Sequence, residues 1–220
     1  MKNIKNNTNN YILWTIQPEE VWLKLQEEEI LFTDISHPRI EKYFIPAYDW
    51  LKEKLVEKIP GYDINHYPWW AWQKYNEDKH EPDLRRIRYY YYNEPLYKIT
   101  LSIPKDQVVL SDFDWWHSCL NYNYLSLTQE EDTLFDKKWL ELLADQNSCY
   151  PDLRKATPEQ LKIWEAEVKE SWNRIFSLEY KEEYKDWGGI NNPIQANFES
   201  LKLEQVIKVK KFNGVHNKSL

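Results

Sequence analysis

Residues 11–33, YILWTIQPEEVWLKLQEEEILFT, are the stretch that decides the fold class. Residues 11–17 form an apolar run rich in strand-forming types, and Pro18 with the two glutamates after it is typical of the first turn of a helix. That helix is expected to end near Glu29, before a short strand at residues 30–33. The stretch therefore predicts a strand, a helix and a second strand in succession.

The remaining chain continues this mixture of helices and strands. Residues 43–59 have apolar side chains at helical spacing and are followed by Pro-Gly, which predicts a helix. In YPWWAW, residues 67–72, strand alternation places Trp70 and Trp72 on one face and Trp69 on the other. Further strands are expected at residues 97–104, 108–110, 194–200 and 203–212.

The order of these elements indicates a single α+β domain at residues 11–212. We expect a mixed, mainly antiparallel sheet flanked by helices, with a helical segment at about residues 128–184 inserted before the last long strand. Residues 1–10 are predicted to be a disordered tail and residues 213–220 a flexible one, because both are polar and lack periodicity. At 220 residues, the chain is long enough for one substantial core.

The composition disfavours several classes of protein. The 36 acidic and 29 basic side chains give a net charge of -7, which disfavours broad binding of duplex DNA. The sequence contains no secretory signal and no apolar run of about 18 residues, so we expect a cytoplasmic protein without a membrane partner. It contains no CxxC pair, HExxH motif or Gly-rich phosphate loop, so no metal is expected. Cys119 and Cys149 are expected to be free thiols.

The aromatic content is unusual, with 12 Trp and 16 Tyr beside only 4 Gly. These rings can stack on nucleobases or on nicotinamide, or they can fill the hydrophobic core. Core packing is the favoured interpretation for most of them, because aromatic residues dominate core burial.

The closing strand has polar side chains at alternate positions. Gln195, Asn197 and Glu199 alternate with apolar side chains, so the three polar groups are expected on one strand face that looks toward solvent or a cleft. The alternative is an ordinary half-exposed strand, since antiparallel sheets often have one wet face.

Several stretches of the chain resemble the bacterial family called domain of unknown function 3841. They span almost the whole chain and read LWTIQPEEVWLKLQEEEILFTD, WAW, PDLR, LSDFDWWH, KESWNRIF and IQANFESLKLEQV. More remotely, the opening strand, helix and strand and the closing QANF are similar to ADP-ribosyltransferases of the DarT type. This wider likeness implies an ADP-ribosyltransferase-like fold, NAD as the bound nucleotide, and a toxin-like role in bacteria or phage.

In that wider family, the glutamate of a QAEF-like motif holds a ribose hydroxyl of NAD. Gln195 and Ala196 match the motif, but Asn197 stands in place of the glutamate, and an amide cannot act as a base. Glu199 lies two residues further on and could replace it if the ligand sits differently. The resemblance therefore makes Gln195, Asn197 and Glu199 the catalytic candidates.

Candidates for contact with the dinucleotide lie on two predicted strands. Thr15 and Gln17 share one face of the first strand. Trp14 either stacks on the ligand or packs in the core, and packing is the favoured interpretation. Trp70 and Trp72 would supply an aromatic wall of the same cleft.

A second group of candidates combines arginines with acids as a substrate or anion site. Arg85 and Arg86 belong to a run of three arginines within four residues, and guanidinium groups bind phosphate or carboxylate through paired hydrogen bonds. Asp112 and Asp114 follow later, and either is also a candidate helix N-cap. His117 is a general base or a packing residue. The favoured alternative for the group is a surface ion-pair network.

Two functions from different classes follow. The first is an ADP-ribosyltransferase-like enzyme that uses NAD and modifies a nucleic acid or a protein. The second is a catalytically inactive module that binds a nucleotide, single-stranded nucleic acid or a protein partner through the same cleft.

Overall fold

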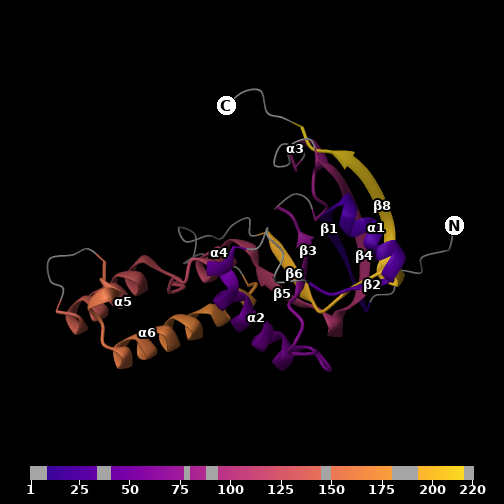
Figure 1. Ribbon diagram of the computed structural model, residues 1–220. Coiled ribbons are helices and arrows are strands. Elements are labelled where there is room, and N and C mark those ends of the chain that lie inside the picture. Colours follow the sequence, from indigo (N-terminus) through magenta and orange to yellow (C-terminus); the bar gives the residue numbers. More distant parts are fainter. Residues whose placement is uncertain are drawn as a thin grey trace. The chain divides into compact units, whose positions relative to one another are not determined.

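The computed structural model describes residues 9–33, 41–76, 80–87, 94–144, 150–179 and 193–215. The chain divides into two compact units (Figure 1). The sheet unit comprises Met1–Ser111 with Pro193–Leu220, and the helical unit comprises Asp112–Asn192. The predicted tails lie mostly outside the described residues, although the first strand already begins at Asn10 and the last ends at Asn213.

The sheet unit contains a six-stranded sheet made of β1 (Asn10–Pro18), β3 (Trp69–Lys74), β4 (Pro95–Pro104), β5 (Val109–Asp112), β6 (Ile194–Phe198) and β8 (Val206–Asn213). The strand order is β5-β6-β3-β1-β4-β8, and the pairs β1/β3, β1/β4, β3/β6 and β4/β8 are antiparallel. A second sheet pairs β2 (Ile30–Leu31) with β7 (Leu201–Lys202). The predicted α+β class with a mainly antiparallel sheet is confirmed.

The described part of the sheet unit contains three helices, of which the first two begin and end close to where the sequence predicts and the third was not predicted. They are α1 (Glu19–Glu28), α2 (Ile45–Lys58) and the short α3 (Leu84–Ile87), with 3-10 turns at Lys42–Phe44, Lys105–Gln107 and Leu203–Gln205. Two glutamates in the first turn of α1 complement its dipole, and Glu29 ends the helix in the left-handed conformation with a φ of 63°. This turn leads directly into β2, which confirms the predicted strand, helix and strand.

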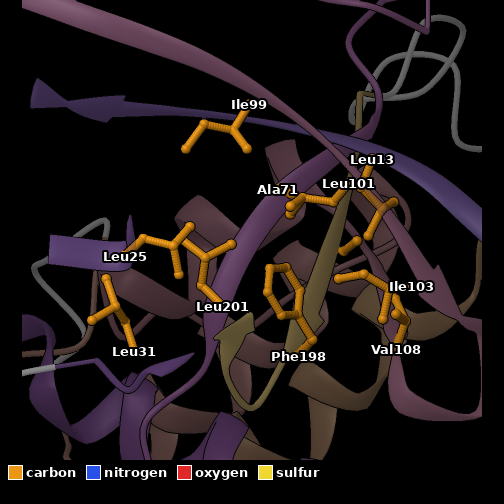
Figure 2. Packing of buried hydrophobic residues seen from close by; sticks show 11 residues of the cluster. Leu13, Leu25, Leu31, Ala71, Ile99, Leu101, Ile103, Val108, Phe198 and Leu201 are labelled. Carbon is orange, nitrogen blue, oxygen red and sulfur yellow. The ribbon is translucent and has the colours of Figure 1, made fainter. Parts of the chain in front are cut away.

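One face of the six-stranded sheet carries the hydrophobic core and is called the core face. Leu13, Ala71, Leu101 and Phe198, from four different strands, are at most 1 % exposed (Figure 2). α1 adds Leu25, and the two-stranded sheet adds Leu31 and Leu201 to the same cluster. The amphipathic α1 and the small sheet therefore cover the core face.

The opposite face, called the second face, carries a row of side chains that crosses five strands. Each member of the row is the direct backbone partner of the next on the neighbouring strand. In order, the members are Lys208, Thr100, Trp14, Trp72 and Gln195. Residues paired directly across antiparallel strands lie on the same face. The two ends of the row differ, because Lys208 is exposed and Gln195 is 3 % exposed. The row therefore passes from solvent into buried surroundings.

The helical unit is built from α4 (Phe113–Leu120), α5 (Gln129–Leu142), α6 (Pro158–Ser171) and the 3-10 turns Leu153–Lys155 and Trp172–Phe176. Trp139, Val168, Trp172 and Ile175 are fully buried and form its core. The Trp172 indole N–H donates to the backbone oxygen of Asn123 at 2.8 Å. Of the predicted helical segment 128–184, residues 145–149 and 180–184 lie outside the described residues.

The cysteine prediction can be followed at one position. Cys119 is a buried free thiol, as predicted, and burial raises its pKa well above the ordinary value. Cys149 lies outside the described residues.

Candidate functional site

A small, partly open cavity lies where β1 ends and β3 begins. Its volume is about 160 Å³, and its wall consists of Gln17, Thr33, Tyr48, Tyr67, Pro68, Trp69 and Trp70. Gln17 comes from β1, Tyr48 from α2 and the two tryptophans from β3. Four of the seven side chains are aromatic, so the cavity is called the aromatic pocket.

Extended segments hold one wall of the aromatic pocket in place. Thr33 forms an isolated antiparallel bridge with Tyr67, and its hydroxyl donates to the backbone oxygen of Pro68 at 3.3 Å. The Trp69 indole N–H donates to the backbone oxygen of Leu31 at 2.9 Å. The chain after β2 is therefore joined to the start of β3 by both backbone and side-chain contacts.

The polar groups of the pocket wall are uncharged hydrogen-bonding groups. The Tyr67 hydroxyl donates to the Asp49 carboxylate, and burial together with this hydrogen bond raises the pKa of Tyr67 to about 12. Burial also raises the pKa of Tyr48. Lys52 lies over the Tyr67 ring, 4.1 Å from its centroid, and 3.6 Å from Asp49. Both tyrosines therefore stay protonated at neutral pH, with aromatic faces and neutral hydroxyl groups.

A histidine and a carboxylate pair beside this pocket. His66 Nδ1 lies 2.8 Å from the Glu199 carboxylate, and both side chains are 28 % exposed. The same carboxylate accepts the backbone N–H of Asp63 at 3.1 Å. Phe32 stacks on the His66 ring with centroids 3.8 Å apart. Phe32 and His66 directly precede the pocket residues Thr33 and Tyr67 in the chain, but neither His66 nor Glu199 is among the residues that line the pocket.

The closing strand differs from its predicted exposure. Gln195 and Asn197 are only 3 % and 2 % exposed, so they do not look toward solvent. Their side-chain amides donate to the Ser111 hydroxyl of β5 at 3.0 Å and 2.9 Å, and Asn197 also donates to the backbone oxygen of Val109 at 3.3 Å. Alternation correctly places both amides on one face. However, they donate their hydrogen bonds to the neighbouring strand β5 and not to solvent or a ligand. Glu199 lies beyond the end of β6 and is the accessible member of the three.

The residues predicted to contact a dinucleotide divide between the two faces of the sheet. Thr15 is 1 % exposed, and its hydroxyl accepts the side-chain amide of Gln17 at 2.7 Å. Gln17 and Trp70 line the aromatic pocket, and Trp70 is 40 % exposed. Trp14 and Trp72 are directly paired on the second face, and Trp72 is 8 % exposed.

The predicted anion site is distributed over both units. Arg85 belongs to the sheet unit, is 82 % exposed and forms an ion pair with Asp83. Arg86 lies in α3, but its side chain is outside the described part of the chain. In the helical unit, Asp112 is 1 % exposed and caps α4 by accepting the backbone N–H of Trp115. The N-cap alternative for Asp112 is confirmed.

The two other members of that group have local partners. Asp114 is exposed in the first turn of α4, and partial burial raises its pKa despite the opposing influence of His117. His117 is exposed, and its Nδ1 lies 2.9 Å from the backbone oxygen of Phe113.

A larger groove of about 920 Å³ lies between α5 and α6 of the helical unit. Its charged groups are paired with one another: Arg174 with Glu131, and Lys138 with Glu167. Arg174 also donates to the backbone oxygen of Leu125. These contacts tie the helices of this unit together, and Glu170 is a further acidic residue of the lining.

Sequence reasoning missed Tyr48, Tyr67 and the pair of His66 with Glu199. Tyr48 lies in α2 but is not one of its buried residues, and Tyr67 directly precedes β3. His66 and Glu199 are separated by 133 residues, so no local pattern joins them. The signal that was available is the placement of Tyr67 and Gln17 at the ends of two predicted strands.

Two kinds of feature are absent from the described residues. Within the ranges that the structure covers, no helix is long and apolar enough to cross a membrane. Among the same residues, no three His, Cys, Asp or Glu side chains are grouped as metal ligands would be.

Comparison with known proteins gives one match. The family model described as domain of unknown function (DUF3841) matches residues 12–207. No curated protein and no solved structure matches the chain.

Proposed function

The chain belongs to the DUF3841 family, and from the geometry of the aromatic pocket we propose that this member binds NAD or a related nucleotide. The observation that supports this proposal is a small cavity with four aromatic side chains and few polar groups, the composition typical of small-molecule sites. The remote resemblance to DarT-type ADP-ribosyltransferases gives NAD priority among nucleotides, as an analogy of fold.

The size of the pocket limits which part of NAD it can hold. Ligand sites commonly measure roughly 300–1,000 Å³. The aromatic pocket, at about 160 Å³, is smaller and therefore suits a single flat ring. The rest of the dinucleotide would lie outside the pocket, next to Trp70, which is 40 % exposed. The aromatic pocket would therefore hold one ring of the nucleotide.

The chemistry of the wall favours the nicotinamide end. Aromatic faces attract a cationic ring, and the nicotinamide of oxidised NAD is a pyridinium cation. The Tyr67 hydroxyl proton is donated to Asp49 and the Gln17 amide nitrogen donates to Thr15, so the oxygens of these two groups can accept hydrogen bonds from a carboxamide. We expect oxidised NAD to bind more tightly than its reduced form, whose nicotinamide ring is uncharged.

The experiment that tests nucleotide binding is titration calorimetry with NAD, together with thermal melts. A ligand that binds only the native state stabilises it by about 2.7 kcal/mol when its concentration is 100 times the dissociation constant. A clear rise in Tm with NAD is therefore expected. No heat of binding and no Tm shift with NAD, its reduced form or mononucleotides would contradict the proposal.

Replacing Trp70 by alanine should weaken NAD binding by about 5- to 100-fold. Stacking of a base on an aromatic ring contributes roughly 1–3 kcal/mol, and Trp70 lines the pocket while being 40 % exposed. Calorimetry measures the change in Kd. Tyr150→Ala is the matched control, because Tyr150 is 74 % exposed in the helical unit and should leave Kd unchanged. Equal affinities for wild type and Trp70→Ala would exclude the aromatic pocket as the site.

ADP-ribosyl transfer to a nucleic acid or a protein is the second candidate function. Glu199 favours it, because this carboxylate is partly exposed and pairs with His66, the residue before Tyr67, whereas Asn197 is buried and hydrogen-bonded to β5. Release of nicotinamide from NAD separates the two candidates. Binding without release, in the presence of single-stranded DNA, RNA or a protein mixture, would indicate an inactive binding module.

A further inference from the structure

The groove between α5 and α6 of the helical unit, called the helix groove, separates two helices that bury few of their side chains (Figure 1). Each helix has 14 residues, yet Trp139 alone is buried on α5, and Val168 and Ser171 alone on α6. Lys138 pairs with Glu167, and the Trp139 indole N–H donates to the same carboxylate at 3.4 Å. These polar contacts join the two helices across a groove of about 920 Å³.

The helix groove is lined by one face of each helix. The lining residues are Glu131, Leu134, Phe135 and Lys138 on α5 and Ala166, Glu167 and Glu170 on α6. Their spacings of one, three and four residues place each set on one side of its helix. Two helix faces that border one groove can hold a third, amphipathic helix, which is a recurring mode of peptide recognition.

Exposed apolar side chains lie along these two faces. Leu134 is 58 % exposed, and Leu142, eight residues further along α5, is 50 % exposed. Ile163, three residues before Ala166 on α6, is 54 % exposed. Single exposed apolar residues are ordinary, but several along the adjoining faces of two helices are typical of a protein interaction site.

The floor of the helix groove is held in place by aromatic and charged contacts. The Phe135 and Tyr124 rings stack, with centroids 3.9 Å apart and 11° between the ring planes. Arg174 lies over the Tyr124 ring, 5.5 Å from its centroid, and also pairs with Glu131. A surface that is already ordered loses little conformational entropy when a partner binds.

The charge of the helical unit favours a basic partner. Its sequence, Asp112–Asn192, contains 17 acidic and 9 basic side chains, a net charge of -8, whereas the whole chain has -7. Both basic residues of the groove lining, Lys138 and Arg174, already pair with glutamates. Glu170 is exposed, and none of the described residues pairs with its carboxylate. This carboxylate can therefore accept a lysine or arginine of a partner.

We propose that the helix groove binds an amphipathic helix of a partner protein, with an apolar face and with lysine or arginine on its flanks. The apolar residues of α5 and α6 would cover the first, and Glu170 would pair with the second. The acidic unit repels nucleic acid, and a second copy of this chain would bring the same negative charge. The proposal is independent of nucleotide binding, because the aromatic pocket belongs to the sheet unit.

The test is fluorescence anisotropy of the full chain with a labelled helical peptide of 14 residues, the length of α5 and α6. The peptide has leucines at spacings of three and four and lysines elsewhere. Its controls are the same peptide with glutamate for lysine, and a scrambled lysine peptide. The lysine peptide should bind about 10-fold more tightly than either control, and its Kd should rise with salt. Equal affinity for the lysine peptide and its scrambled form would overturn the proposal.

Two matched pairs of variants locate the site. Leu134→Ser should weaken binding of the lysine peptide about 10-fold, because its apolar contact is lost, whereas Leu23→Ser, on α1 and 56 % exposed, should not. Glu170→Lys should also weaken it about 10-fold. Glu165→Lys makes the same charge change on an exposed position of α6 outside the lining, and should change Kd less than about twofold. Equal effects within either pair would overturn the proposal.

Nuclear magnetic resonance maps the bound surface without substitutions. The methyl resonances of Leu134 and Ala166 should shift when the lysine peptide is added, whereas those of Leu23 should not. Shifts confined to the sheet unit would overturn the proposal. So would a dimer of the full chain, seen by light scattering, that Leu134→Ser dissociates, because a second copy would then be the occupant of the groove.

Discussion

Asn197→Asp should destabilise the protein by about 4 kcal/mol at pH 7.5 and by much less at pH 4.5. Aspartate has the same shape as asparagine, so the substitution changes only hydrogen-bonding capacity and charge. Asn197 is 2 % exposed and donates to the Ser111 hydroxyl and to the backbone oxygen of Val109. A carboxylate cannot donate to either oxygen, and its charge would be buried facing the carbonyl oxygen of Val109.

The sign of the pH dependence follows from the pKa of the new side chain. Burial disfavours the charged form, so the aspartate pKa in the folded protein should exceed its unfolded value of about 3.9. The folded state then binds more protons than the unfolded state, and stability falls as the pH rises between these two pKa values. A shift of about three units corresponds to the loss of about 4 kcal/mol at neutral pH.

Urea denaturation at the two pH values measures this effect. Asn213→Asp is the matched control, because Asn213 is exposed at the end of β8 in the same sheet and should change stability by less than about 0.5 kcal/mol. An equal loss of stability at both pH values would contradict the proposed cause. If Asn197→Asp were as stable as the wild type at pH 7.5, the hydrogen bonds that the Asn197 side chain donates would not be needed for stability.

Phe198→Ala should destabilise the folded chain by about 3–5 kcal/mol, the usual cost of removing a buried phenylalanine ring. Phe198 is 1 % exposed and belongs to the core face of the sheet. Figure 2 shows its ring between Leu201 and Ile103. Alanine would leave a cavity in the core face. The surrounding side chains are closely packed, so they cannot fill it without movement of the strands.

The change is measured as the shift of the urea midpoint. Ile12→Ala on β1 is the comparison, because Ile12 is 40 % exposed and its truncation should cost less than about 1 kcal/mol. A loss for Phe198→Ala as small as that for Ile12→Ala would mean that the core face does not carry the stability of this unit.

Much of the fold follows from local patterns in the sequence. The apolar run before Pro18 predicts β1, and the Pro-Gly at residues 60–61 marks the end of α2 within two residues. Alternation in YPWWAW correctly separates Trp69, whose paired position is Phe198 on the core face, from Trp70 and Trp72. These features are local, so propensity and periodicity are sufficient to find them.

The candidate site depends on contacts between distant residues. Alternation places Gln195 and Asn197 together, but their exposure depends on Ser111, which is 84 residues from Gln195 in the sequence. Likewise, the aromatic pocket draws its wall from β1, the segment after β2, α2 and β3. Only the pairing of strands shows that Gln17 and Tyr67 share one cavity, because strand order is not encoded in the pattern of any single strand.

The strand order also has a consequence for protein synthesis. β6 lies between β5 and β3, although the whole helical unit is made between β5 and β6. Until β6 leaves the ribosome, β3 presents an unpaired edge with the sequence WWAWQK, and such apolar edges promote aggregation. A chain that stops before Pro193 would keep this edge permanently. The last strands therefore complete the sheet late in translation, and incomplete chains of this protein should depend on chaperones or be degraded.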